Sequence, residues 1–243
     1  GDADINSSNK TARHNAALHA TFHAFKAVTP PDSLPAPVVL CDRGDGTSVS
    51  KDEAKRRWAH INDGHVPDLA RLSAPPHAHE LKVYTPFNQN VTLGVGAAAS
   101  TAEGHTYAFG NTAESLRKLV FGLAQIGNPG DRAFDRATGA GFVAACRGDY
   151  SDAKDKGHGV SLHHAESTGA LGAVFMATLR ILARQSRLKG ATDYTRYGAG
   201  RASSKAFLTH HVANISTAIQ VADANSVLAA ASHRSLRQSL GLD

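Results

Sequence analysis

The stretch Glu166–Leu188, ESTGALGAVFMATLRILARQSRL, has a clear helical period. Core-type side chains recur at the spacing i, i+3, i+4, i+7 and i+11, which predicts an amphipathic helix with one face on a core. This stripe consists of Leu171, Val174, Phe175, Thr178 and Leu182. Three arginines, Arg180, Arg184 and Arg187, follow i, i+4, i+7 on another face. The helix therefore separates an apolar face from a basic one.

Basic charge continues beyond this helix. Residues 179–205 hold seven lysines and arginines against one acid, Asp193, an excess of six, whereas the whole chain has a net charge of +5. Solvated helix faces usually mix both signs of charge, so an unmixed basic face favours an anionic partner. Tyr194 and Tyr197 are interleaved with the arginines. Arginine beside an aromatic residue is typical of grooves that bind single-stranded nucleic acid.

Two further basic clusters, around residues 55–57 and 117–118, are candidates for the same surface. We expect the three clusters to face one groove and to contact the phosphates of a nucleic acid. The candidate binding residues are Lys55, Arg56, Arg57, Arg117, Lys118, Arg180, Arg184, Arg187, Lys189, Arg196, Tyr197 and Arg201.

The composition is that of a globular protein with an anionic partner. The 243 residues are enough for one large domain or two lobes, and the sequence pI is about 9.3. The longest apolar run is too short for a membrane span, and the N-terminus lacks the apolar core of a signal peptide. Two cysteines do not make a disulfide framework, which favours a reducing compartment.

Periodicity and turn signals predict a mainly α chain with a few short strands in the N-terminal half. The spacing Ser50 to Glu53 matches a capping box that opens a helix through Trp58. The other predicted helices span residues 11–28, 111–127, 129–146, 166–188, 203–221 and 232–240. The predicted strands span residues 37–41, 80–85 and 91–96.

The fourteen histidines raise the question of a metal site or a catalytic site. The local pairs are His163-His164, His210-His211 and His77-x-His79, and none of these has the i, i+4 spacing of a helical zinc pair. We therefore expect no metal, no cofactor and no catalytic residue. The alternative from another class is a Cys/His hydrolase, with Cys41 or Cys146 as the nucleophile and a histidine as the base.

Several motifs follow one another along the chain in the order found in one viral family. They are Phe22, Phe25 and Lys26; Ala54, Lys55, Arg56 and Trp58; Val83, Tyr84, Phe87 and Asn90; the helix Thr112–Gln125; Val160, Glu166, Leu171 and Gly172; Arg196, Tyr197 and Gly198; and Leu240–Leu242. On these residues the chain resembles the orthobunyavirus-type nucleoproteins of segmented negative-strand RNA viruses. One departure is His163-His164-Ala165, where the family has aromatic residues before the basic helix.

The resemblance implies a two-lobed helical fold with a basic groove and terminal arms. It implies a non-enzymatic protein that encapsidates single-stranded genomic RNA without sequence specificity. It also implies homo-oligomers, rings or filaments, formed through both arms, contact with the viral polymerase, and a location in the virion and the host cell cytoplasm. An alternative is the coat protein of a flexible filamentous RNA virus; the hydrolase alternative would be a secreted effector.

The expected division of the chain follows from this fold. It consists of an N-terminal arm, an N-terminal lobe, a C-terminal lobe and a C-terminal arm, at residues 1–16, 17–126, 127–222 and 223–243. The N-terminal arm is polar and is expected to be mobile. The C-terminal arm carries Leu228, Leu236 and Leu240, a short apolar face that needs a surface to cover it.

Overall fold

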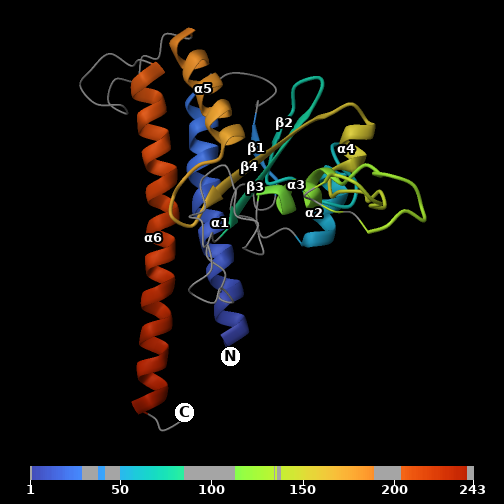
Figure 1. Cartoon of the computed structure of the whole chain (residues 1–243). Coiled ribbons are helices and arrows are strands. Elements are labelled where there is room, and N and C mark those ends of the chain that lie inside the picture. The colour runs from blue at the N-terminus through green and yellow to red at the C-terminus, as the bar shows by residue number, and fades with distance from the viewer. Residues whose placement is uncertain are drawn as a thin grey trace.

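A four-stranded mixed sheet forms the centre of the molecule, with helices on both of its faces (Figure 1). The computed structural model describes residues 2–28, 38–41, 50–84, 113–133, 135, 138–188 and 204–239. The strands are β1 (Val39–Leu40), β2 (Leu69–Arg71), β3 (His77–Tyr84) and β4 (Gly159–Glu166). They lie in the order β1-β2-β3-β4. The first two pairings are antiparallel, whereas β3 and β4 are parallel.

Three helices, α1 (Asp2–Ala27), α5 (Ala173–Leu188) and α6 (Ser204–Ser239), cover one face of the sheet. Successive side chains of a strand point to opposite faces, so Leu81 and Ala165 face this layer. They share a buried cluster with Phe25 of α1, Phe175 of α5 and Ile215 of α6. We refer to α1, α5 and α6 as the long-helix layer.

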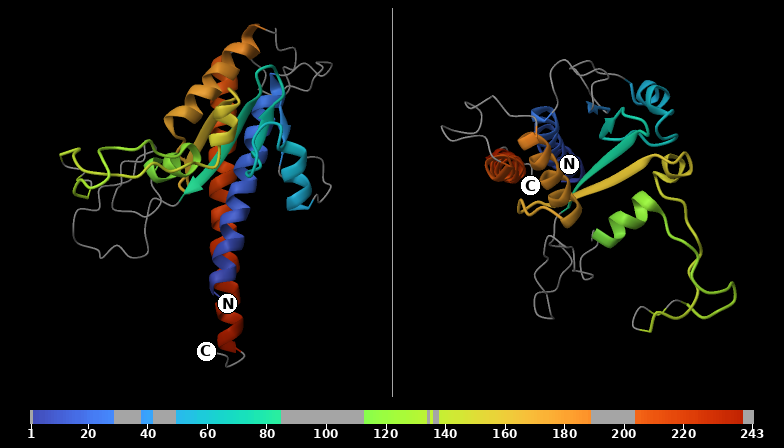
Figure 2. Two further views of the ribbon diagram at one scale, coloured as in Figure 1. Left: turned by 90° about the vertical axis from the view of Figure 1, so that its right-hand side faces the viewer. Right: turned by 90° about the horizontal axis from the view of Figure 1, so that it is seen from above.

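Three shorter helices, α2 (Lys51–Trp58), α3 (Ala113–Phe121) and α4 (Ser151–Asp155), cover the other face. Ala78 of β3 and Leu162 of β4 face this side. They form a second buried cluster with Trp58 of α2, Val120 of α3 and Ala153 of α4. We refer to α2, α3 and α4 as the short-helix layer. The view from above shows the same separation (Figure 2, right).

Helices α1 and α6 run antiparallel and extend together beyond the sheet (Figures 1 and 2). Helix α6 has 36 residues and is therefore about 54 Å long. It buries Phe207, Ile215 and Ile219, which recur at multiples of four and share one face. Because the two helices are antiparallel, the N-terminal end of α1 and the C-terminal end of α6 lie at the same end of the molecule. None of the helices in the described residues is long and apolar enough to span a membrane.

The prediction of a mainly α, two-lobed fold with strands only in the N-terminal half is wrong. Strand β4 lies in the second half of the chain and pairs with β3 over the full length of both strands. The residues of β4 from Leu162 to Glu166 are all buried. A strand buried on both faces shows no polar–apolar alternation, and the sequence therefore predicts no strand at residues 159–166.

Several predicted helices have different bounds. Helix α1 begins at Asp2 and not at Thr11, and the two predicted C-terminal helices form one helix, α6. The predicted N-cap at Ser50 is confirmed, because the Glu53 N–H donates to Ser50 Oγ at 3.2 Å. The predicted strand at residues 91–96 lies outside the described residues.

The helix predicted at residues 129–146 is absent from its described positions. The chain there forms an irregular antiparallel ribbon, in which Ile126 pairs with Val143 and Asp135 with Ala140. Gly139 and Gly141 have φ values of 69° and 111°. These left-handed conformations favour glycine and are incompatible with an α-helix, so the two glycines end the helical pattern.

Candidate nucleic-acid interface

Helix α5 exposes arginine and apolar side chains together on its outer face. Its inner face buries Phe175 and Leu182, as the predicted stripe requires. It also buries Leu179, which the stripe does not include, whereas Val174 of the stripe is 39% exposed. Arg180 and Arg184 are exposed, and Ile181 between them is 53% exposed. The helix contains no Asp, Glu or Lys. Arginine with apolar residues and without acids is the composition of binding interfaces.

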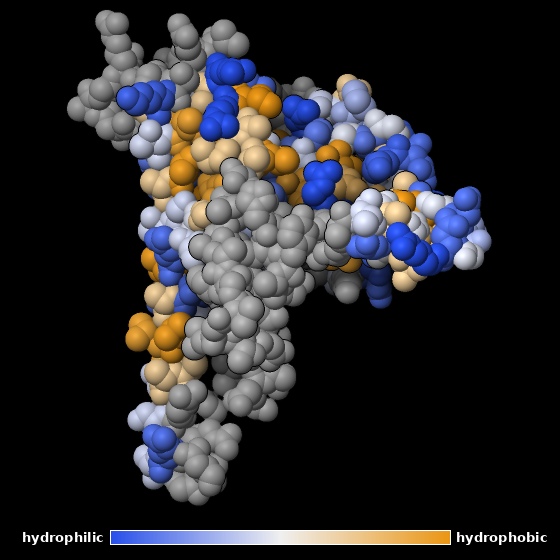
Figure 3. Space-filling view, in the orientation of Figure 1, coloured by the Kyte–Doolittle hydropathy of each residue, from blue (hydrophilic) through white to orange (hydrophobic). Residues whose placement is uncertain are grey.

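The two exposed arginines of α5 have no acidic partner in the part of the chain that the structure describes. Within the described part of the chain, no acid forms an ion pair with Arg180 or Arg184. Arg147, by contrast, lies 2.7 Å from the Asp155 carboxylate. A guanidinium without an acidic partner presents its N–H fork to a phosphate, which it binds in a bidentate manner. Figure 3 shows strongly hydrophilic side chains beside hydrophobic ones at the top of the molecule, where α5 lies.

The basic residues of α2, Lys55, Arg56 and Arg57, are stabilised in part by interactions within their own helix. Arg56 and Arg57 are exposed and Lys55 is half-buried. The Arg57 guanidinium lies 5.4 Å from the centre of the Trp58 ring, a cation–π distance. The three cations occupy the last turn of α2, where the helix dipole favours positive charge.

The cluster on α3 is similar. Arg117 and Lys118 are exposed, and the Arg117 guanidinium lies 5.7 Å from the centre of the Phe121 ring. Lys118 lies in the last turn of the helix. The basic side chains of α2 and α3 thus have stabilising contacts within their own helices. No such contact is found for Arg180 and Arg184 among the described residues.

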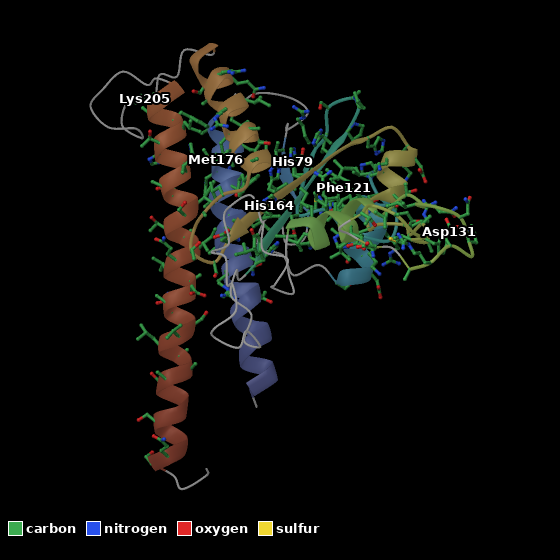
Figure 4. The ribbon with its side chains drawn as sticks, in the orientation of Figure 1. His79, Phe121, Asp131, His164, Met176 and Lys205 are labelled. Atoms are coloured by element: carbon green, nitrogen blue, oxygen red, sulfur yellow. The ribbon has the colours of Figure 1, made fainter. Side chains whose placement is uncertain are left out.

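The predicted groove that unites the three clusters is not formed by the described residues. Helix α5 packs in the long-helix layer, and α2 and α3 pack on the opposite face of the sheet. Figure 4 shows the same separation, with Met176 of α5 on one side and Phe121 of α3 on the other. The prediction was wrong because helical periodicity places charges on a face of a helix but does not assign that helix to a face of the sheet.

Four candidate RNA-binding residues lie outside the described residues, namely Lys189, Arg196, Tyr197 and Arg201. Arg187 lies in the last turn of α5. The structure therefore places Arg180, Arg184 and Arg187 on one helix, as the sequence predicts.

A buried polar network on the short-helix side was missed by the sequence analysis. Glu80 of β3 is 1% exposed and accepts hydrogen bonds from Tyr150 and Lys82 and one at 3.3 Å from His65 Nε2. Burial raises the pKa of Glu80, but the hydrogen bond from His65 and the charge of Lys82 outweigh it and lower the pKa to about 2. The carboxylate is therefore held ionised and joins β3 to α4.

The same network fixes the state of its neighbours. The hydrogen bond to Glu80 raises the pKa of His65, and burial together with the Glu80 charge raises the pKa of Tyr150 well above its usual value. The neutral phenol therefore remains the donor. In sequence, Glu80, His65 and Tyr150 are widely separated, and no motif links them.

A second buried carboxylate, Asp68, ties α1 to the sheet. It accepts hydrogen bonds from the Leu81 N–H and from His14 Nε2, the latter at 3.2 Å. Burial lowers the pKa of His14, but the bond to Asp68 and its charge raise it overall. His14 is therefore more basic in the folded protein than in the unfolded chain, and its protonation strengthens this contact.

Histidines gather between the sheet and the long-helix layer. His77 and His79 of β3 stack with ring centres 4.5 Å apart, and His79 Nδ1 lies 3.0 Å from His163 Nε2. Among the described residues, no group of three or more His, Cys, Asp or Glu side chains has the geometry of a metal site.

The two cysteines of the hydrolase alternative lie in different surroundings. Cys41 is buried beside Trp58, whose indole N–H donates to the Cys41 carbonyl oxygen at 3.0 Å. Cys146 is exposed in the antiparallel ribbon, paired with Leu123.

Comparison with known proteins found no matching family model, no matching curated protein and no matching solved structure.

Proposed function

We propose that this protein binds single-stranded RNA through the outer face of α5 and packages it as a nucleoprotein. One observation carries the proposal: Arg180 and Arg184 are exposed one turn apart on a helix without acids, and no described acid pairs with them. One helical turn spans about 5.4 Å, close to the separation of successive phosphates in an extended strand. The resemblance to orthobunyavirus-type nucleoproteins supports RNA as the anion.

Apolar residues on the same face suit a flexible strand better than a rigid duplex. Ile181 lies between the arginines and Val174 precedes them, and both are partly exposed. They offer apolar area to the faces of unstacked bases, while the arginines hold the backbone. Phosphate contacts carry no sequence information, so binding is expected to be tolerant of sequence. The proposed role is packaging, in virions and in the cytoplasm of an infected cell, and not catalysis.

The basic segment after α5 extends the proposed contact. Lys189, Arg196 and Arg201 follow the helix in sequence, and Tyr197 supplies a ring for stacking on a base. Because α2 and α3 lie on the opposite face of the sheet, we assign their basic clusters no part in the primary RNA contact.

Assembly through the terminal helices completes the proposal. The C-terminal half of α6 exposes Val221, Val227 and Leu228, each by more than half. Figure 3 shows hydrophobic surface along the part of α6 that extends beyond the sheet. Val221 and Leu228 are seven residues apart and share one side of the helix, and exposed apolar residues favour contact with another protein surface. We propose that this surface belongs to a second copy of the chain, as packaging of a long strand requires, and that the viral polymerase is a further partner.

The salt dependence of RNA binding tests the proposal. For a single strand, log affinity against log salt has a slope of about −0.7 for each phosphate contacted. Arg180→Ala with Arg184→Ala should therefore make the slope shallower by about 1.4, equally for poly-U, poly-A and mixed RNA. Fluorescence anisotropy with labelled RNA at several salt concentrations measures it.

The matched control replaces two exposed arginines on the other face of the sheet, Arg56→Ala with Arg57→Ala. This variant has the same loss of net charge and should retain the slope. Equal effects of both double variants would indicate non-specific attraction by net charge. An unchanged slope in the α5 variant alone would show that this helix does not contact RNA.

A further inference from the structure

His79 and His163 form a hydrogen-bonded pair at the boundary between the sheet and the long-helix layer. They come from adjacent parallel strands, β3 and β4, and their side chains are linked by a bond of 3.0 Å between His79 Nδ1 and His163 Nε2. The two residues are 5% and 1% exposed. Figure 4 shows His79 between the sheet and the long helices.

Each histidine contacts one helix of the long-helix layer. The ring centre of His79 lies 4.8 Å from that of Phe25 in α1, and the ring of His163 lies 5.1 Å from Phe175 in α5. Phe25 is 5% exposed and Phe175 is fully buried. The pair therefore forms part of the surface on which both helices pack.

The pair is suited to the neutral state only. A neutral imidazole carries one N–H, so one ring donates in the mutual bond and the other accepts. The outer nitrogens, His79 Nε2 and His163 Nδ1, are buried, and no described residue forms a hydrogen bond with them. A proton added to the pair would give an imidazolium whose new N–H finds no acceptor among the described residues of this apolar layer, and such burial of an unpaired charge is strongly unfavourable.

The surrounding charges oppose protonation. Arg71 of β2, His77 of β3 and His164 of β4 act on the pair, and each is positive when charged. On α1, the neighbouring His23 and Lys26 are exposed, and on α5 the charged Arg180 and Arg184 are exposed. The buried carboxylates Glu80 and Glu166 occupy even positions of the strands and lie on the opposite face of the sheet.

Burial and the neighbouring positive charges also determine the direction in which the pKa values of the two histidines are shifted. Burial lowers the pKa of His79 well below its ordinary value and lowers the pKa of His163 to about 3. In a state in which the helices have left the sheet, water reaches both rings and the ordinary value near 6.5 returns. The open state therefore binds protons more strongly than the closed state, and acid favours opening below pH 6.5.

We propose that the His79–His163 pair is an acid-sensitive latch that holds the long-helix layer on the sheet at neutral pH and releases it on acidification. The proposal goes beyond RNA binding and does not depend on it. Its consequence for the chain is that α1 and α5 open while the short-helix layer, built on the other face of the sheet, remains packed.

One titrating group on the same layer works in the opposite direction. His14 of α1 faces Asp68, and acid strengthens that contact because the pKa of His14 is raised by it. The two effects act at different places, since His14 lies about three turns from Phe25 along α1. A comparison between the protein and a variant of the histidine pair removes the His14 contribution, because both forms retain it.

Hydrogen exchange of the full chain, corrected for the intrinsic effect of pH on exchange, measures the opening. Each histidine with an open-state pKa near 6.5 should raise the opening constant about tenfold between pH 7.5 and pH 5.5. For the two histidines, this predicts an increase of up to about 100-fold at amides in residues 17–27 and 173–186. Amides of α2 and α4 should change much less.

A variant without titratable groups tests the cause. The double variant His79→Leu, His163→Leu replaces the two imidazoles by apolar side chains of similar size. It should remove most of the pH dependence of the opening constant in α1 and α5. His19→Gln, which replaces an exposed histidine of α1, is the matched control and should retain it. In the double variant, His77 remains in place, so a residual response of up to about tenfold is expected.

Two results would overturn the proposal. One is that, in the unaltered chain, amides of both helical layers lose protection from hydrogen exchange equally on acidification. This would indicate global unfolding. The other is that the double leucine variant responds to pH as strongly as the original chain.

Discussion

Arg13 of α1 and Asp223 of α6 form an ion pair between residues 210 positions apart in the sequence. Their side chains are 15% and 37% exposed, so the pair is partly shielded from water. It joins the predicted N-terminal and C-terminal arms within one chain, at the point where α1 and α6 extend beyond the sheet. The two helices thus stabilise each other as an antiparallel pair.

Loss of the Arg13–Asp223 ion pair should weaken the packing of α1 against α6. Arg13→Ala is expected to lower the free energy of unfolding by about 1 kcal/mol, because partly shielded ion pairs contribute little more than exposed ones. A double-mutant cycle with Asp223→Ala in urea unfolding isolates the pairwise energy. A coupling energy of zero would show that the two side chains contribute through separate contacts.

The same pair distinguishes intramolecular packing from exchange between copies. Arg13→Asp places two carboxylates at this contact, and Asp223→Arg places two guanidinium groups there. If α1 and α6 exchange between subunits, as domain-swapped assemblies do, mixing the two single variants brings opposite charges together. We expect the mixture to form larger species by light scattering than either variant alone.

The charge-swapped double variant in one chain is the control for that experiment, because it restores opposite charges without exchange. Identical masses for the mixture and for both single variants would contradict an exchange of α1 and α6 between copies of the chain.

Glu80→Gln should destabilise the protein in a pH-dependent manner. The folded-state pKa of Glu80 is about 2, below the value of 4.5 in the unfolded chain, so its stabilising effect is present above pH 4.5 and disappears as the pH falls towards 2. At pH 7 the expected loss is about 3 kcal/mol, since Lys82 and His65 lose a buried partner. Urea unfolding at pH 7 and pH 3, followed by the fluorescence of Trp58, measures it.

The difference between the protein and the Glu80→Gln variant should therefore be smaller at pH 3 than at pH 7. Asp52→Asn, an exposed carboxylate in the first turn of α2, serves as the control and should change stability little. A difference that is constant with pH would mean that Glu80 acts through packing and not through its charge.

Ser50→Ala should remove the cap of α2. Ser50 Oγ accepts the Glu53 N–H at 3.2 Å, and loss of such a cap costs about 1 kcal/mol. Ser50→Asp retains an acceptor and should be nearly neutral. Both free energies of unfolding follow from denaturant titrations monitored through Trp58, the residue that ends this helix.

The sequence by itself determined the local features of this protein. It predicted the capping box at Ser50, the helix that carries Arg180 and Arg184, and the burial of Phe175 and Leu182. These features depend on interactions between residues three or four positions apart, so a short window of sequence contains all the information they need.

Only the tertiary structure decided the sheet and the sites built on it. The pairing of β3 with β4 joins residues 84 positions apart in the His79–His163 contact, and β4 gave no alternating pattern because both of its faces are buried. The same pairing forms the face of the sheet that carries Glu80 and the opposite face, which carries His79 and His163. It separates the basic residues of α5 from those of α2 and α3, because which face of a sheet a helix covers depends on how whole apolar surfaces fit together and not on any local pattern of residues.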